Sequence, residues 1–240
     1  MALNHRFERS LLEGPRSRLK ELGTIGRVAR EMFRGFRKLH FIGPCVTVFG
    51  SARIEEGSVE YEATRRIAAG LGQEGFSIIT GGGPGVMEAA NRGARDVGAT
   101  SVGCNIRLPH EQKPNEHLDV SIDFNYFFVR KVMLVKYSYA FVVMPGGFGT
   151  LDELFEALTL IQTKKIKDFP VVVMGRDYWG ALDALLERMA REGMINKEDM
   201  NLLLFTDDVD EAIAHVSRAV SDRFALHPRR HPIRVLGEVG

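Results

Sequence analysis

Short apolar runs alternate with amphipathic helical segments along most of the chain. Apolar runs bounded by glycine or proline predict five strands, at Cys45–Phe49, Phe76–Thr80, Thr100–Ile106, Ala140–Met144 and Pro170–Met174. Helical spacing predicts six helices between or after them, at Tyr61–Glu74, Val86–Val97, Phe127–Tyr139, Leu151–Thr163, Trp179–Glu192 and Val209–Val220. The short run Asn201–Phe205 fits a strand or a turn. This alternation predicts an α/β fold, a doubly wound parallel sheet of Rossmann-like, nucleotide-binding type.

A basic helical segment precedes this domain. Between Leu19 and Leu39, apolar residues recur at helical spacing and arginines stand between them; the apolar positions are Ile25, Val28, Ala29, Phe33 and Phe36. A stripe this apolar favours packing on the protein's own core or on a second subunit over contact with membrane or nucleic acid. We therefore expect a basic helical arm over residues 1–40, a Rossmann-like domain over 41–220 and an irregular C-terminal tail over 221–240.

Composition sets broad limits on location and partners. The formal net charge is +1, which is not that of a nucleic-acid-binding protein. No apolar run approaches the roughly 18–20 residues of a membrane span. Cys45 and Cys104 lie in apolar, strand-like runs without metal-ligand spacing, which favours reduced, buried thiols. We expect a cytoplasmic protein without nucleic-acid or membrane partners.

Three glycine-containing turns follow predicted strands. They are Gly50-Ser51, Gly81–Gly85 and Pro145–Thr150. Because the carboxyl ends of parallel strands meet at one edge of a sheet, a single ligand could contact all three turns. Within the second turn, Gly82 and Gly83 are the candidate contacts. For Gly50-Ser51, ligand contact and a simple turn are equally consistent with the sequence.

The third turn leads directly into a helix, and that arrangement favours anion binding. Free N–H groups and the positive end of a helix dipole meet there, most often around a phosphate. Gly146, Gly147 and Gly149 allow the backbone to approach the anion closely, and Thr150 adds a hydroxyl donor. Glu153 is unexpected beside a phosphate, so it either begins the helix or acts elsewhere on the ligand.

Several cofactor signatures are missing from these turns. A dinucleotide fingerprint fails, because Val86, Glu88 and Asp152 stand where its last glycine should be, and no P-loop is present. His227 and His231 have metal-like spacing, but Pro228 and Pro232 break the helix that such a site needs. We therefore expect no metal and no cofactor, and a mononucleotide or sugar phosphate as ligand.

Two long motifs resemble the Lonely Guy family. Gly81–Asn91 is similar to one hallmark of that family, and Pro145–Glu153 is similar to its P-G-G-x-G-T-x-x-E motif. Phe127–Lys131 lies between them as a third element, and Gly103–Gln112 resembles the longer bacterial branch. The resemblance runs from about Cys45 to Ala214. Some members of the family carry the misleading name lysine decarboxylase.

The resemblance implies an activity. Members are cytokinin riboside 5′-monophosphate phosphoribohydrolases, which cleave the N-glycosidic bond of a nucleoside 5′-monophosphate to free base and ribose 5-phosphate. It implies that the turn Gly146–Thr150 holds the 5′-phosphate and that Arg130 and Glu153 are the catalytic pair, with Lys131 beside them. It further implies that Met87 and Thr159 line the nucleotide pocket. A homodimer or larger homo-oligomer is also implied. Phe148 departs from the tyrosine of plant members, and Asp152 from a glutamate.

The proposed chemistry is consistent with the residue types. Cleavage of a ribosyl C–N bond builds positive charge on the sugar, as in glycoside hydrolysis. A carboxylate such as Glu153 can stabilise that charge and orient or deprotonate water. Arg130 stays protonated, so it can clamp phosphate or ribose or neutralise charge on the departing base.

Other assignments stay open at this point. Glu156 is equally well explained as a binding residue or as a carboxylate that stabilises the start of its helix. Glu111, with Gln112, is slightly better explained as pocket lining than as part of a structural loop. A carrier or sensor that binds a nucleotide or the molybdenum cofactor without turnover is the alternative function. Decarboxylation would need pyridoxal phosphate on a lysine, and no lysine has a recognisable context for it.

Overall fold

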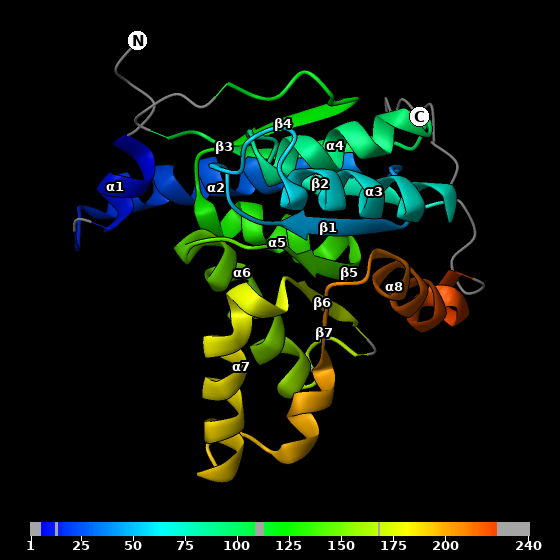
Figure 1. Ribbon diagram of the computed structural model, residues 1–240. Helices are drawn as coiled ribbons and strands as arrows, with labels where there is room; N and C mark the ends of the chain where they lie inside the picture. The colour runs from blue at the N-terminus through cyan, green and yellow to red at the C-terminus, as the bar shows by residue number, and fades with distance from the viewer. Residues whose placement is uncertain (1–5, 13, 109–112, 168, 225–240) are drawn as a thin grey trace.

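The computed structural model describes residues 6–12, 14–108, 113–167 and 169–224. Its centre is a seven-stranded, wholly parallel sheet with the order β4-β3-β2-β1-β5-β6-β7 (Figure 1). The strands are β1 Cys45–Phe49, β2 Ser77–Thr80, β3 Ser101–Ile106, β4 Val120–Phe124, β5 Ser138–Val143, β6 Val171–Met174 and β7 Leu203–Thr206. The order reverses between β1 and β5, which pair at the centre. The predicted doubly wound sheet is thereby confirmed, with its switch point between these two strands.

Helices cover both faces of the sheet. The helices are α1 Arg6–Leu12, α2 Arg18–Leu39, α3 Val59–Gln73, α4 Val86–Asp96, α5 Phe127–Tyr137, α6 Phe148–Gln162, α7 Arg176–Arg191 and α8 Val209–Phe224, with a 3₁₀ helix η1 at Lys197–Leu202. One core lies between the sheet and α2, α5, α6 and α7, and includes Leu39, Met133, Leu154 and Trp179. The other lies between the sheet and α3, α4 and α8, and includes Ile67, Ala90 and Val216. A sheet buried on both faces explains why its strands appear as continuous apolar runs.

Strand β1 illustrates the arrangement. All five of its residues are buried. Val46 and Val48 belong to the core beneath α3, α4 and α8, whereas Cys45 and Phe49 belong to the opposite core. Successive side chains of a strand point to opposite faces, so an apolar residue is needed on both sides. Cys45 and Cys104 are free, buried thiols, as expected.

The structure differs from the sequence-based expectations in several places. It contains α1 and the edge strand β4, neither of which the apolar pattern predicts. Helix α6 begins at Phe148, about one turn earlier than the predicted Leu151, so the second half of the turn Pro145–Thr150 belongs to the start of the helix. The predicted C-terminal tail, with His227 and His231, lies almost wholly outside the described residues.

The N-terminal arm packs on the sheet's own core through part of its apolar stripe. Val28, Met32 and Phe36 contact the core, but Ile25 and Phe33 stay more than 60% exposed, at 63% and 62%. Ile25 and Phe33 are therefore not buried within one chain, and packing of these two side chains on a second subunit stays a prediction. Over the described ranges, no helix has both the length and the apolar character needed to cross a membrane.

Candidate active site at the switch point

Backbone hydrogen bonds join the three glycine turns at the carboxyl edge of the sheet. The Ser51 N–H donates to the Pro145 carbonyl at 2.9 Å, and the Val86 N–H donates to the Ser51 carbonyl at 3.1 Å. The turn after β1 therefore touches both the turn before α4 and the turn before α6. The structure brings together the three segments that the sequence places at one edge.

The glycines in these turns meet two different requirements. Gly82 has φ of +73°, and a Cβ there would lie 1.8 Å from the Asn105 Oδ1, so only glycine fits. A Cβ on Gly147 or Gly149 would meet nothing within 4 Å. Gly82 thus allows dense packing behind the site, whereas Gly147 and Gly149 leave open space in front of the backbone.

Buried polar side chains support the turn at Gly82 and Gly83. The Thr80 hydroxyl accepts from the Gly82 N–H at 2.9 Å and donates to Asn91 at 2.6 Å. The Asn115 amide donates to the Gly83 carbonyl and to Asn91, both at 3.0 Å. The sequence pattern did not reveal these supports. A polar Asn91 on the buried face of α4 was the one available signal.

The turn before α6 presents its N–H groups outward. Gly147 is the N-cap, and its carbonyl accepts from the N–H groups of Thr150 and Leu151, both at 3.0 Å. The N–H groups of Phe148 and Gly149 start the helix and have no carbonyl within it to bond. The Tyr178 hydroxyl, from the start of α7, donates to the Gly146 carbonyl at 2.7 Å. This geometry is suited to a phosphate.

Arg130 and Glu153 lie beside these turns. Arg130 comes from the first turns of α5, and its Nη1 would be 3.7 Å from a Cβ on Gly81. Its Nη2 lies 3.7 Å from the Glu153 Oε1. Glu153 is 2% exposed, and no described residue hydrogen-bonds to either of its carboxylate oxygens. The pair is an ion pair with unused acceptors on the carboxylate.

Burial shifts the protonation of both partners. Removal from water raises the pKa of Glu153 to about 7, although Arg130 and Lys131 act in the opposite direction. Removal from water also lowers the pKa of Arg130, with Glu153 opposing that change. Near neutral pH, Glu153 is therefore ionised in part of the molecules and protonated in the rest, so it can accept or donate a proton. A carboxyl group with such a pKa is suited to general acid–base work.

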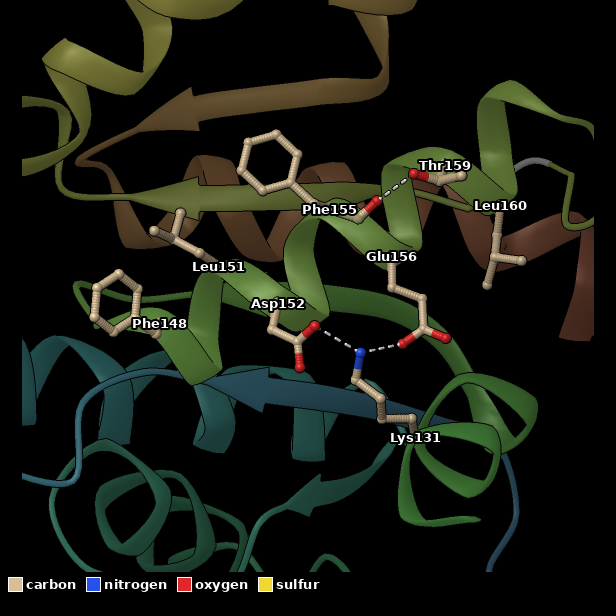
Figure 2. A pocket seen from close by; sticks show the side chains of 8 residues that line it. All are labelled: Lys131, Phe148, Leu151, Asp152, Phe155, Glu156, Thr159 and Leu160. Atoms are coloured by element: carbon tan, nitrogen blue, oxygen red, sulfur yellow. Dashed lines mark hydrogen bonds and ion pairs between the residues drawn. The ribbon is translucent and has the colours of Figure 1, made fainter. Parts of the chain in front are cut away.

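A second group of charges lies on the outer side of the same two helices. The Lys131 ammonium sits between two carboxylates of α6, 2.8 Å from the Asp152 Oδ1 and 2.7 Å from the Glu156 Oε2 (Figure 2). Partial burial lowers the pKa of Lys131, but these two hydrogen-bonded carboxylates outweigh that effect and raise it. Asp152 was noted in the sequence only as a departure from the family motif.

An open hollow of about 560 Å³ adjoins this charged group. Phe148, Phe155 and Thr159 line it together with Lys131 and Glu156 (Figure 2). The Thr159 hydroxyl donates to the Phe155 carbonyl of its own helix. Arg130 and Glu153 are not among the residues that line the hollow. The predicted site is thus divided between a buried pair at the glycine turns and an exposed hollow along α6.

The remaining predicted residues are placed as follows. Met87 packs against the second glycine turn, since a Cβ on Gly81 would be 2.8 Å from its sulfur. Gly50 and Ser51 are partly exposed at the switch point. Glu111 and Gln112 lie outside the described residues. No group of three or more metal-binding side chains occurs within the described ranges.

Comparison with known proteins adds the family and relatives. The model of a family described as "Possible lysine decarboxylase" matches residues 87–216. A protein of Mycobacterium tuberculosis named cytokinin riboside 5′-monophosphate phosphoribohydrolase is 31% identical over 63% of this chain and 82% of its own length. A rice protein with the name probable cytokinin riboside 5′-monophosphate phosphoribohydrolase LOGL1 is 26% identical over 77% of this chain and 83% of its own.

Solved structures share the fold at lower sequence identity. The molybdenum cofactor carrier protein of Chlamydomonas reinhardtii aligns with a TM-score of 0.57 and 24% identity, over 74% of this chain and 98% of its own. A molybdenum cofactor binding protein of Rippkaea orientalis aligns with a TM-score of 0.54 and 21% identity, over 74% and 96% of the two chains. These likenesses extend to the fold alone.

Proposed function

Since this chain belongs to the Lonely Guy family, the family described as possible lysine decarboxylases, we propose that it is a nucleoside 5′-monophosphate phosphoribohydrolase. Its substrate is adenosine 5′-monophosphate or an N6-modified form of it, and its products are the free base and ribose 5-phosphate. The names of the mycobacterial and rice relatives support this assignment. The reaction consumes one water and uses no cofactor.

The observation that carries the proposal is the state of Glu153. This carboxyl group is buried next to Arg130, and neither of its oxygens accepts a hydrogen bond from a described residue. Leaving buried acceptors unpaired costs free energy, so a structural carboxylate would normally have donors around it. Acceptors kept free at a switch point are available to substrate and water.

In the proposed mechanism, phosphate binding positions the sugar. The N–H groups of Phe148 and Gly149 and the positive end of α6 hold the 5′-phosphate. Binding energy from this part of the substrate, which does not react, places the ribose near Glu153. Ionised Glu153 stabilises the positive charge that develops on the sugar, and it accepts a proton from the attacking water.

Arg130 has a separate task in this mechanism. Its guanidinium stays charged and offers several donors, so it holds the substrate or balances negative charge on the departing base. We assign Lys131, Glu156 and Thr159 to substrate contacts around the adjoining hollow, because they line it beside the catalytic pair.

We also propose that the protein forms at least a homodimer. Phe148 is 93% exposed next to the candidate site, and the arm leaves Ile25 and Phe33 exposed. Large apolar side chains gathered on a surface are typical of an interface. Light scattering at micromolar concentration should give at least twice the chain mass, and a monomer mass would refute this assignment.

Product analysis tests the proposed function. Wild-type protein is incubated with AMP, isopentenyladenosine monophosphate, GMP and CMP, and the products are separated by chromatography. We expect free base and ribose 5-phosphate from an adenine nucleotide. Binding without release from any of the four, or a tightly bound coloured or fluorescent pterin in the purified protein, would instead indicate a carrier.

A further inference from the structure

The N-terminal helix α2 runs beside the free edge of the sheet. Strand β4 is the last strand in the order, so its outer carbonyl groups have no neighbouring strand. The Lys38 ammonium donates to the Ser121 carbonyl at 3.0 Å, and Arg34 donates to the Asp123 carbonyl. Helix α2 also packs against α5 (Figure 1). The arm therefore holds the strand that leads into the helix carrying Arg130.

Beyond β4, two carboxylates of the arm cap the start of α5. Glu31 is buried and accepts from the N–H groups of Asn125 at 2.6 Å and Tyr126 at 3.2 Å, and from the Asn125 side chain at 2.9 Å. Glu8 of α1 accepts from the Phe127 N–H at 3.0 Å. The N-cap residue Tyr126 makes no side-chain cap of its own. Carboxylates from a distant segment thus satisfy N–H groups that a helix start leaves free.

The capped turn is the one that orients Arg130. The Arg130 N–H donates to the Tyr126 carbonyl at 3.2 Å, which closes the first turn of α5. The Arg130 guanidinium lies 5.2 Å from the centre of the Phe127 ring, in a cation–π contact. Glu31 and Glu8 hold the N–H groups of Tyr126 and Phe127, so they fix two residues that contact Arg130.

We propose, on the basis of the function proposed above, that Glu31 and Glu8 are positioning residues for Arg130. Helices α1 and α2 then support the active site through the start of α5, without contacting the substrate. The phosphate turn is held by other elements, through Tyr178 and the turn after β1. With Arg130 acting on the departing base in the transition state, loss of a cap should therefore impair turnover and leave substrate affinity intact.

Hydrogen exchange of the full-length protein tests the positioning without any activity. Glu31→Gln should speed exchange of the amides of residues 125–130, because the charge-assisted bonds of Asn125 and Tyr126 become weaker bonds to a neutral amide and the first turn of α5 opens more often. Glu21→Gln is the matched control: Glu21 lies on the same helix and pairs with Arg16 within the arm. Unchanged exchange at residues 125–130 in Glu31→Gln would overturn the proposal.

A double-mutant cycle tests whether the positioning acts through Arg130. Glu31→Gln should lower kcat by roughly tenfold to 100-fold, the scale of a small displacement of a reacting group, with KM unchanged. In an Arg130→Met background, the same substitution should cause no further loss, because its effect passes through the missing side chain. Equal losses in both backgrounds would show a merely structural role and overturn the proposal.

A variant that does not fold and a failure of the proposed function can both be distinguished from a failure of this proposal. If Glu31→Gln does not fold, Glu8→Ala removes the acceptor of the Phe127 N–H and enters the same exchange experiment and cycle. If the wild-type protein releases no base, the proposed function fails, and exchange at residues 125–130 still decides whether the arm fixes the start of α5.

Discussion

Helices α5 and α6 face each other through two neighbouring ion pairs of opposite character. The Arg130 Nη2 and the Glu153 Oε1 are 3.7 Å apart, the Glu153 side chain is only 2% exposed, and its carboxylate has no hydrogen-bond donor among the described residues. One residue further along, Lys131 contacts Asp152 at 2.8 Å and Glu156 at 2.7 Å, and Asp152 is 59% exposed. The tighter contacts therefore belong to the more exposed group.

The difference shows which contacts indicate function. Short ion pairs near solvent are screened and contribute little to stability. Burial of Glu153 raises the pKa of its carboxyl group to about 7 although Arg130 and Lys131 lower it, and the carboxylate oxygens keep unused acceptors. Glu153 is therefore suited to chemistry because its carboxylate is buried and no described residue donates a hydrogen bond to it.

The largest expected effect is a difference in turnover between variants of the neighbouring residues Arg130 and Lys131. Arg130→Met should lower kcat/KM by roughly 10²–10⁴, the scale of a group that stabilises developing charge. Lys131→Met, its matched control, should lower it by about tenfold, because Lys131 is already neutralised by two carboxylates. Initial rates of base release measure both variants. Equal losses of kcat/KM in the two variants would show that Arg130 and Lys131 do not differ in their contribution to catalysis.

The next contrast is in the pH dependence of stability. The folded-state pKa of Glu153 lies above its unfolded value, so this group favours folding fully below about pH 4.5. That contribution is lost as pH rises through about 7. Glu153→Gln should therefore gain up to about 3 kcal/mol over wild type between pH 5 and pH 8.

Urea unfolding at both pH values measures this change, with Asp152→Asn as the exposed control. Asp152→Asn removes a carboxylate from the same helix at a side chain that is 59% exposed, so it controls for the loss of a surface charge. If the difference in unfolding free energy between Glu153→Gln and wild type did not change with pH, burial would not raise the pKa of Glu153.

The smallest expected effect concerns the phosphate turn. Gly149→Ala adds a methyl group in open space within a helix, so stability should change by no more than about 1 kcal/mol. The methyl group would occupy open space at the turn assigned to the phosphate, and KM should rise by about tenfold, the scale of one good hydrogen bond to an anion. Gly26→Ala in α2, also in open space, is the control. An unchanged KM would place the phosphate elsewhere.

The sheet and most helices could be predicted because their signals are local. β1 is a mostly apolar run of small and β-branched residues ending in Phe49, and the helical period of α3 or α4 is contained within its own sequence. Strand β4 was missed because it lies at an edge, where Ser121 and Asp123 interrupt the apolar pattern. Its partners in α2 are more than 80 residues away, at separations of 83 and 89 residues. Such a partnership has no local signature.

The same limit applies to the site. The motif residues Arg130 and Glu153 could be identified by resemblance, and the common edge of the three turns followed from the parallel sheet. The burial of Glu153 and its lack of donors depend on how α5 and α6 pack, which no single segment encodes. The capping by Glu31 joins residues 94 and 95 positions apart, so the sequence alone gave no sign of it.

Single-turnover base release by two neighbouring carboxylate variants tests the central claim most directly. Glu153→Gln and Asp152→Asn each change one carboxylate to an amide, and nucleotide affinity is measured for both by calorimetry. With enzyme in excess over an adenine nucleotide, we expect Glu153→Gln to slow release by roughly 10²–10⁴ while still binding, and Asp152→Asn to stay within about tenfold of wild type. Wild-type release by Glu153→Gln would contradict the assignment of Glu153 as the catalytic carboxylate.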